Sequence, residues 1–427
     1  MYVANRLMAS LVGVALLGVA GVATAQTDQL TWAIRNVRVF DGERVAENRT
    51  VLLQGRLIGT VGAGNMALPE GAVEIDGTGK TLMPGLIDSH THVVDSFSAN
   101  SGRSLLQASA YGITTVVDLG ANNRNDYVVF RRAAGNSAFP GGADMRTAGP
   151  GLMAGALKSA AEASAWVAWH KQGGADFIKI FAPTSLAADP NIETMNAVTA
   201  AAKTAGLITV AHSTTEAVSR RLVEGGLKGL VHLSNTADSA DFGSFLAKAG
   251  VFQSTNIVGA APAAYRQRLA SDADLQPYMP AFMVEGLKGA RNPQQPARFQ
   301  AQVANFKAMQ KAGVLLLAGT DGVYPYQPLL HAELEILSKE GGLSPVEALK
   351  TATSNPAQAY GLNDRGRIAE GLRADVVLLN GDPTKNILDA RRIEMVFING
   401  TPVDREYLRE ELSRVAPPPG GATPAGG

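Results

Sequence analysis

The 427-residue sequence contains no cysteine and only six histidines. Without cysteine, the protein cannot form disulfides, thiolate metal sites, iron–sulfur clusters or a cysteine nucleophile. Any metal site must therefore be built from histidine, aspartate, glutamate or a less common ligand.

The sequence also lacks an excess of charge, because 38 Lys and Arg residues balance 38 Asp and Glu residues. Its pI is about 7.0, and no block of five or more like charges occurs. These features argue against nucleic acid, other polyanions and anionic membranes as partners. A small molecule is the expected partner.

Long apolar runs are absent after residue 25, but one occurs at the start of the chain. Arg6 precedes an uncharged stretch with the core LVGVALLGVAGVA, which ends at Ala23-Thr24-Ala25. This order predicts a signal peptide over residues 1–25, cleaved before Gln26, and a periplasmic or secreted protein. The alternative is an uncleaved membrane anchor, since 19 uncharged residues nearly span a bilayer. After cleavage we expect no contact with the membrane.

Short strand-like segments occupy both ends of the remaining sequence. Residues 26–84 and 366–410 contain alternating apolar segments separated by Asp-Gly and Gly turns, which predicts one β-sandwich built from both ends. The Pro/Gly-rich tail, from Ala416 within residues 411–427, is expected to be disordered.

Between these ends, residues 85–365 alternate strand-like runs with Ala-rich helical stretches, which is typical of a parallel α/β fold. Eight strands are expected, as a closed (β/α)8 TIM barrel requires. Their predicted ranges are Leu86–His92, Thr114–Gly120, Asp144–Gly149, Phe177–Phe181, Ile208–Ser213, Gly229–Ser234, Val251–Ile257 and Leu315–Asp321.

Two histidines at the end of the first predicted strand are candidate metal ligands. His90 and His92 are two residues apart, so both side chains project to the same side of the strand. Two imidazoles on one side can chelate a divalent ion. The spacing alone leaves ordinary surface or core histidines as an alternative.

Lys179 lies within the apolar strand Phe177–Phe181 and points to the same side as both phenylalanines. Burial in a barrel would lower the pKa of the lysine and make a neutral amine available. Such an amine can add CO2 to form a carbamate with two oxygens that can bind cations. The alternative is a lysine paired with an aspartate or extended toward solvent at the end of the strand.

Three further residues each follow a short apolar run: His212, His232 and Asp321. With His90, His92 and Lys179 they make six candidate side chains. Their order along the chain places them on strands one, four, five, six and eight of the predicted barrel. All would meet at the carboxyl end of the barrel, where barrel enzymes carry their chemistry.

This set resembles the two-metal, carboxylated-lysine subtype of the amidohydrolase superfamily. The segments IRNVRVFDG, QGRLIGTVG, MPGLIDSHTH, TSNPAQAYGL and EGLRADVVLLNGDP are also similar to landmarks of that superfamily, over nearly the whole mature chain. The 20-residue gap from His212 to His232 is closest in pattern to the Xaa-Pro dipeptidase and imidazolonepropionase-like branch. The sequences VHLS at His232 and GPGLMAGALKS after the third strand depart from the dipeptidase pattern.

The resemblance implies two divalent metal ions, with zinc as the default, and a CO2-derived carbamate on Lys179. His90, His92 and Asp321 would hold the more buried ion, and His212 and His232 the other. Asp321 would be the catalytic acid and base in the attack of a metal-bridging hydroxide on an amide, for example in a dipeptide or an N-acyl amino acid. The alternatives are an ester or lactone hydrolase with the same site, and a noncatalytic binding protein.

Substrate contacts are expected from loops at the carboxyl ends of the strands. The polar and aromatic candidates there are Ser96, Arg124, Asn235, Asn256, Arg266, Tyr324, Tyr326 and His331. For His331 a helix-surface or capping role is the alternative, and His170 is expected to be structural. Relatives commonly form symmetric oligomers, so a homo-oligomer is possible.

Overall fold

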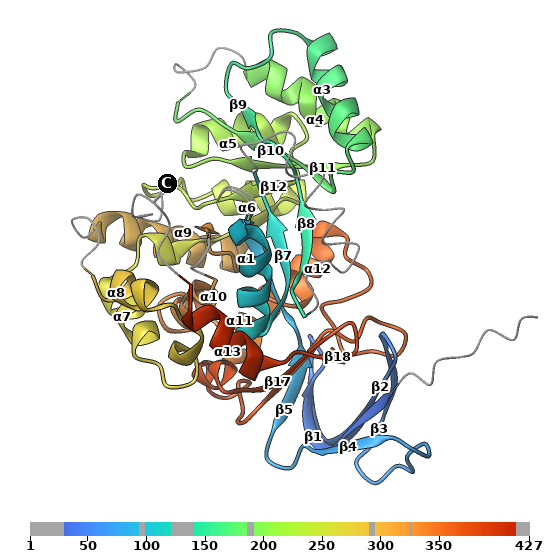
Figure 1. Cartoon of the computed structure of the whole chain (residues 1–427). Coiled ribbons are helices and arrows are strands. Elements are labelled where there is room, and N and C mark those ends of the chain that lie inside the picture. Colours follow the sequence, from blue (N-terminus) through green and yellow to red (C-terminus); the bar gives the residue numbers. More distant parts are fainter. Residues whose placement is uncertain are drawn as a thin grey trace, which may run out of the picture.

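The computed structural model describes residues 30–93, 99–120, 141–185, 192–289, 295–323 and 327–415. The predicted signal peptide 1–25, residues 416–427 of the tail, Ser96, Arg124, Tyr324 and Tyr326 lie outside these ranges. Within them, no helix has the length and apolar character needed to cross a membrane. Figure 1 shows a helix-covered barrel with a curled β domain at one end.

The β domain is built from both ends of the chain, as predicted. Strands β5 (Thr81–Pro84) and β16 (Val376–Leu379) pair antiparallel and join the two parts into one eight-stranded sheet. Its core contains Ile34, Leu53 and Phe397, which are fully buried. The other strands are β1 (Thr31–Phe40), β2 (Val45–Gln54), β3 (Leu57–Ala63), β4 (Val73–Asp76), β17 (Ile393–Ile398) and β18 (Thr401–Pro402).

The central part of the chain forms the predicted (β/α)8 barrel of parallel strands. The strands are β6 (Leu86–His92), β7 (Ile113–Asp118), β8 (Asp144–Thr147), β10 (Phe177–Phe181), β11 (Ile208–His212), β12 (Gly229–Val231), β13 (Phe252–Ser254) and β14 (Leu315–Leu317). The barrel closes where the amide of Ser89 donates to Ala318 O at 3.2 Å. Two short strands extend the edges: β9 (Leu152–Met153) pairs with β10, and β15 (Gly322–Val323) pairs with β6.

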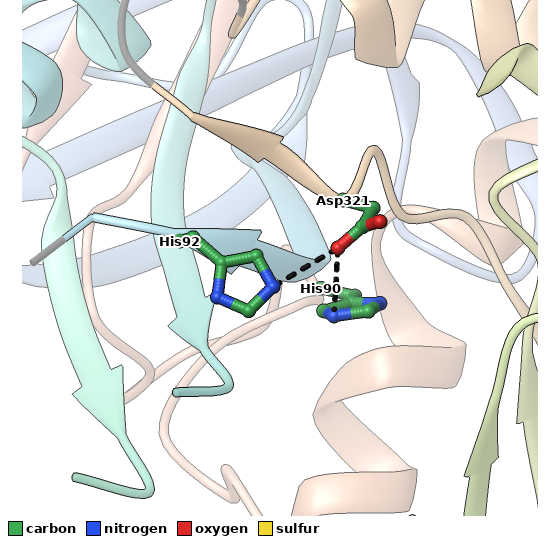
Figure 2. Close-up of side chains that lie close together, drawn as sticks. All are labelled: His90, His92 and Asp321. Atoms are coloured by element: carbon green, nitrogen blue, oxygen red, sulfur yellow. Dashed lines mark hydrogen bonds and ion pairs between the residues drawn. The ribbon is translucent and has the colours of Figure 1, made fainter. Parts of the chain in front are cut away.

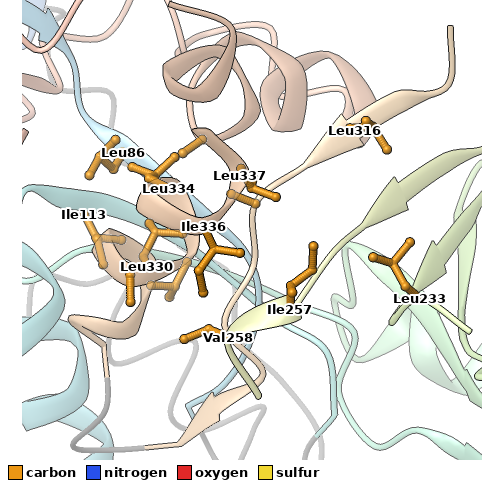
Figure 3. Close-up of a cluster of buried hydrophobic side chains, with 14 of the residues drawn as sticks. Leu86, Ile113, Leu233, Ile257, Val258, Leu316, Leu330, Leu334, Ile336 and Leu337 are labelled. Atoms are coloured by element: carbon orange, nitrogen blue, oxygen red, sulfur yellow. The ribbon is translucent and has the colours of Figure 1, made fainter. Parts of the chain in front are cut away.

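Helices surround this barrel because their apolar faces pack on the strands. They are α1 (Ala99–Ala110), α3 (Ala160–Gln172), α4 (Ile192–Thr204), α5 (Glu216–Glu224), α6 (Phe242–Ala249), α7 (Ala263–Ala270), α8 (Ala281–Lys288), α9 (Pro296–Ala312), α10 (Leu329–Lys339), α11 (Pro345–Thr351), α12 (Ser354–Tyr360) and α13 (Arg405–Ser413), with 3-10 turns η1 (Ile257–Gly259), η2 (Gln276–Tyr278) and η3 (Ile387–Arg391). Figure 3 shows Leu330 and Leu334 of α10 lying near Ile113 and Leu86 at the starts of β7 and β6. Inside the barrel, Tyr360 of α12 packs on Phe177 and Phe252.

Helix α13 corrects the predicted domain boundaries at the end of the chain. The sequence pattern predicts a β-sandwich up to residue 410 and a disordered tail from residue 411. Instead, α13 continues to Ser413, and Leu408 and Leu412 are buried against Ala110 of α1. The apolar spacing of these two leucines, four residues apart, places both on the helix face that meets the barrel.

Candidate metal centre

His90, His92 and Asp321 form a compact group at the carboxyl end of the barrel (Figure 2). One ligand atom from each residue lies within 4.8 Å of the others. Asp321 Oδ1 is 2.9 Å from His92 Nε2 and 3.2 Å from His90 Nε2. The two imidazoles come from alternate positions of β6, and the carboxylate comes from the turn that follows β14.

A buried carboxyl group holds these two elements together. Asp88 Oδ1 accepts hydrogen bonds from the amides of His90 (3.2 Å) and Thr320 (3.1 Å), and Asp88 Oδ2 accepts one from the Thr320 hydroxyl (2.7 Å). Asp88 is completely buried, and burial raises the pKa of its carboxyl group to about 7. Asp88 therefore fixes the strand that carries His90 against the turn that carries Asp321.

His212 and His232 approach the same centre from the next strands. Their ring centroids are 4.2 Å apart, and the His232 ring is 5.0 Å from that of His90. His232 Nε2 lies 3.8 Å from Asp321 Oδ2. The structure therefore brings all four histidines predicted as ligands to one place around Asp321.

Lys179 completes the group from β10. It is fully buried, and its ammonium Nζ has no hydrogen-bond partner among the described residues. Nζ lies 5.2 Å from the centre of the Phe181 ring. Burial lowers the pKa of Lys179 to about 7, although the negative charges of Asp321 and Asp118 oppose the shift. The lysine is thus neither paired with an aspartate nor extended to solvent.

The pKa values of the side chains at the centre leave these groups in protonation states that can bind a cation. Burial lowers the pKa of His90 well below its ordinary value, that of His212 to about 4 and that of His232 to about 3. Burial alone would raise the pKa of Asp321, but His90, His232 and His92 together hold it well below its ordinary value. The neutral imidazoles of His90, His212 and His232 therefore face an ionised carboxylate.

Hydrogen bonds at the far sides of the rings select the ligand atoms. His90 Nδ1 faces Asn256 Oδ1 at 3.3 Å, and His92 Nδ1 faces Gly120 O at 3.3 Å. Both oxygens are acceptors, so with a cation bound each Nδ1 can donate its proton to one of them and each Nε2 can offer a lone pair to the cation. His90 Nε2, His232 Nε2 and Lys179 Nζ are buried without hydrogen-bond partners among the described residues. This donor set fits divalent cations, as the sequence predicted.

Three residues at the centre adopt left-handed backbone conformations. The φ angles are 69° at His232, 63° at Asn256 and 53° at Asp321. Non-glycine residues rarely adopt these angles, and such strain is found where function requires it. Each turn ends a strand segment and directs a polar side chain toward the centre.

The residues predicted to contact substrate lie in different environments in the structure. Asn235 is exposed three residues after His232, and its Oδ1 accepts from Gln302 at 3.4 Å. Asn256 instead contacts a candidate metal ligand, because its Oδ1 lies 3.3 Å from His90 Nδ1. Arg266 is buried on α7 and donates to Val258 O at 3.4 Å, so it is not a loop residue open to a ligand.

Two other histidines lie away from the centre. His331 is buried on α10, and its Nε2 is 3.0 Å from the carbonyl oxygen of Tyr111, which precedes β7 at the amino end of that strand. The structure therefore places His331 inside the protein and away from the centre, at the amino end of β7. His170 is structural as expected, with Nε2 2.8 Å from Pro150 O and Nδ1 3.0 Å from Trp166 O.

Two supporting residues escaped the sequence analysis. Asp88 precedes His90 by two residues, and its position on the inward face of the first strand was the available signal. Glu333 on α10 is fully buried and accepts hydrogen bonds from the Thr255 hydroxyl (2.5 Å) and from the amides of Ile257 (3.0 Å) and Val258 (2.7 Å). No local pattern distinguishes it from a surface glutamate.

Comparison with known families gives the class to which this fold and this site belong. The profile of the Amidohydrolase family matches residues 81–403, about three quarters of the chain, and the chain therefore belongs to this family. Members are metal-dependent hydrolases acting on carbon–nitrogen bonds, which confirms the class predicted from the sequence.

Curated relatives match over short segments. Adenine deaminase 2 of Desulfotalea psychrophila is 40% identical over 83 residues, 19% of this chain and 13% of the relative. Imidazolonepropionase of Deinococcus radiodurans is 33% identical over 94 residues, 21% of this chain and 24% of the relative. The matches thus span less than a quarter of the length of these relatives.

Solved structures match over most of the chain. A Xaa-Pro dipeptidase with bound methionine in its active site has a TM-score of 0.70 at 18% identity, over 87% of this chain and 99% of the other. Phenylurea hydrolase B has a TM-score of 0.71 at 22% identity, over 89% and 98%. At these identities the likeness confirms the barrel and the β domain.

Proposed function

We propose that the protein is a hydrolase of amide bonds in small molecules, working with two divalent metal ions. His90, His92 and Asp321 would hold one ion, and His212 and His232 the other. Lys179 as a carbamate would bind both, and zinc is the first candidate for a site of imidazole and carboxylate ligands. The proposal places the enzyme in the periplasm or outside the cell, following the signal-like sequence of residues 1–25.

One observation carries the proposal: a buried lysine of lowered pKa lies among four histidines and an ionised aspartate. The pKa of Lys179 is about 7, so a large fraction is uncharged at neutral pH. The neutral amine can attack CO2, forming an N–C bond and releasing one proton to solvent. The resulting carbamate places a negative charge on the buried side chain, which suits cation binding.

The residues of this chain then have distinct roles in hydrolysis. Two bound divalent ions would polarise the scissile carbonyl and lower the pKa of water. Asp321 accepts a proton from the attacking water and passes it to the leaving nitrogen, which an amide requires because an amine anion leaves poorly. Asn256 and Gly120 hold the rings of His90 and His92 in the orientation described above.

The test is hydrolysis by the full-length protein loaded with Zn²⁺ in bicarbonate. Matched panels of N-acyl amino acids, dipeptides, esters and lactones are assayed, and bound metal is counted. We expect amides to be cleaved, and Asp321→Asn to lower kcat by roughly 10³-fold or more, as for loss of a group central to proton transfer. Asp274→Asn, at an exposed aspartate, is the matched control.

Other outcomes identify the alternatives. Faster cleavage of lactones or esters than of any amide would make the protein an esterase or lactonase with the same site. Full metal occupancy without hydrolysis of any panel member would support a noncatalytic binding protein. Failure to bind divalent ions would contradict the proposed metal-dependent hydrolysis.

A further inference from the structure

The carboxyl end of β10 carries an aromatic side chain directly beside the candidate metal centre. Phe181 follows Lys179 by two residues, so both side chains project to the inner side of the barrel. The centres of the Phe181 and His212 rings are 6.0 Å apart, and Lys179 Nζ lies 5.2 Å from the centre of the Phe181 ring. Phe181 is half-buried, whereas Lys179 is fully buried. The ring therefore borders the centre at the mouth of the barrel, where it is partly open to solvent.

Two glycines, one after β7 and one before β9, leave room for this ring. A Cβ atom at Gly151 would lie 2.3 Å from Phe181 Cε2. A Cβ atom at Gly120 would lie 3.1 Å from Phe181 Cζ and 3.4 Å from His92 Cε1. Because the ring borders the space next to His92 as well as His212, it lies beside ligands assigned to both metal ions. A substrate amide bound between the ions would therefore have Phe181 as a neighbour.

A second apolar side chain lies next to Phe181 on the neighbouring strand. Met153 of β9 is the partner of Phe181 in the parallel pairing with β10. The preceding pair, Leu152 and Ile180, is buried in the core between strands and helices, so residues 153 and 181 project to the other side, toward the barrel mouth. Met153 is 59% exposed, more than any other large apolar side chain in the part of the chain that the structure describes. Phe181 and Met153 thus form an apolar wall beside the centre.

We propose that the apolar wall of Phe181 and Met153 binds an apolar substituent, branched aliphatic or aromatic, that the substrate carries next to its scissile amide. This role rests on the proposed amide hydrolysis and narrows its substrate class. A ligand that covers an exposed apolar face removes it from water, which favours binding. An aromatic ring and a flexible thioether together can pack against apolar groups of different shapes.

The chemistry of the two side chains explains why the substituent should be apolar. A phenyl ring has no hydrogen-bond donor, and a thioether is only a weak acceptor. A polar substituent placed against the wall would lose hydrogen bonds to water without replacing them, which weakens binding. The amide itself stays beside the histidines and Asp321, so the wall acts on the substituent alone. Discrimination between apolar and polar substituents of equal size is therefore the property that the wall adds to the centre.

The first experiment compares uncharged apolar and polar substrates of equal size with the metal-loaded full-length protein. N-acetylleucinamide and N-acetylglutaminamide form one matched pair, with the test group on the leaving amine. Isocaproyl-glycinamide and succinamoyl-glycinamide form the other pair, with the test group on the acyl side. We expect the wild type to favour the apolar member of at least one pair roughly 10- to 100-fold in kcat/KM, which is the range for burial of one apolar side chain. Equal rates within both pairs would overturn the inference.

Met153→Gln is the main variant, because Met153 is exposed and an amide of similar length should leave the fold intact. It should lower kcat/KM for the apolar substrate roughly tenfold and change the polar substrate little. Phe181→Ala should abolish the preference. Leu57→Gln, at an exposed leucine of β3 in the β domain, is the matched control and should keep the full preference. Equal losses for both substrates in Met153→Gln, or an unchanged preference, would show that the wall does not recognise the substituent.

A second measurement does not depend on turnover. Hydroxamates chelate divalent ions and would hold an acyl chain beside the centre, so isocaproyl hydroxamate and succinamoyl hydroxamate are titrated calorimetrically into the metal-loaded protein. We expect Kd to be roughly 10- to 100-fold lower for the apolar hydroxamate, with the difference reduced in Met153→Gln and unchanged in Leu57→Gln. A preference that depends on the wall, without hydrolysis of any amide, would keep this inference and remove the proposed function. Hydrolysis of amides without such a preference in either experiment would do the reverse.

Discussion

Lys179 is the single residue whose chemistry most directly separates a two-metal centre from a one-metal centre. If the proposed two-metal centre is correct, Lys179→Ala should lose most hydrolytic activity and much of the second metal ion, because His212 and His232 would be left without the proposed bridging carbamate. His90, His92 and Asp321 should still retain one ion. Metal analysis and initial rates measure both effects, and a short carboxylic acid such as propionate should restore part of the activity. Full activity of the unrescued variant would contradict the carbamate role.

Gly319 shows how little space surrounds His90. A Cβ atom at this position would lie 2.6 Å from Ser254 Oγ and 3.0 Å from both the N and Cβ atoms of His90. The backbone of β6 must move to admit it, so Gly319→Ala should weaken metal binding by about tenfold or more through displacement of a ligand. Competitive titration with a chelating dye measures the affinity. Gly259→Ala is the control, since a Cβ atom there meets nothing within 4 Å. Equal affinities in both variants would disprove the effect.

The side chains that meet at the candidate metal centre could be predicted from the sequence, whereas the residues that support them could not. Four of these residues are histidines, a residue type that occurs only six times in the sequence, and the set His90, His92, Lys179, His212, His232 and Asp321 lies in or just after apolar runs, so position along the chain carries the signal. Asp88 and Glu333 are common charged residues, and their roles depend on burial and on partners far away in the sequence. For example, 78 residues separate Thr255 from Glu333.

At the level of elements, the strand β10 was predicted with its observed bounds, but several strands end earlier than predicted. The range Gly229–Ser234 was expected, and β12 ends at Val231. The next residue, His232, has a φ angle of 69°, which breaks the strand conformation. The strand Leu315–Asp321 was expected, and β14 likewise ends earlier, at Leu317. The apolar pattern of the sequence therefore indicates where these strands start. The turns that carry His232 and Asp321 determine where they end.

Helix α10 positions a ligand through a neighbouring loop. Glu333 accepts hydrogen bonds from residues 255–258, and this segment contains Asn256, which holds His90. In Glu333→Gln, an NH2 group replaces one acceptor and leaves buried backbone amides unsatisfied, which should reduce the free energy of unfolding by about 2 kcal/mol. It should also weaken metal binding, because Asn256 loses its fixed position. Urea denaturation and metal titration measure the two effects.

A second variant separates stability from positioning. Asn256→Ala removes the contact with His90 but leaves the bonds to Glu333 in place. It should therefore weaken metal binding with a smaller loss of stability than Glu333→Gln. Unchanged metal affinity in both variants would show that Glu333 supports only the packing of α10.

The same helix makes the fold sensitive to acid. Burial lowers the pKa of His331 from 6.5 to about 4, while the unfolded chain should keep the ordinary value. Below about pH 6.5 the unfolded state binds a proton that the folded state does not, so the contribution to stability falls until about pH 4. This loss amounts to at most about 3 kcal/mol. His331→Gln should reduce the decline of unfolding free energy between pH 6.5 and 4, as measured by urea denaturation of the metal-free protein. Identical slopes for both proteins would exclude this role.

In the whole molecule, the two parts of the β domain, which flank the barrel in the sequence, join into one sheet at one end of the barrel. The sequence shows this arrangement because turn-rich strand segments occur on both sides of the α/β region. The contact between α13 and α1 could not be predicted from the sequence, since the pattern of a short amphipathic helix does not identify the surface on which it packs. Arg365, which follows α12 in the chain, connects this part of the chain to two barrel strands. Its Nη1 lies 2.5 Å from Asp144 Oδ2 of β8 and 3.0 Å from Thr115 Oγ1 of β7.

Metal removal should affect the stability of the entire barrel. The six proposed ligands come from β6, β10, β11, the residue after β12 and the turn after β14, so bound ions connect strands that are distant in the sequence. A ligand that binds only the folded state at 1,000 times its Kd stabilises that state by about 4 kcal/mol. We therefore expect chelation to lower Tm and Zn²⁺ to restore it, as measured by calorimetry. In His92→Asn the shift should shrink, whereas Arg38→Gln, in the β domain, should keep the full shift. A Tm that is unaffected by chelation would mean that the six side chains do not hold metal in the folded protein.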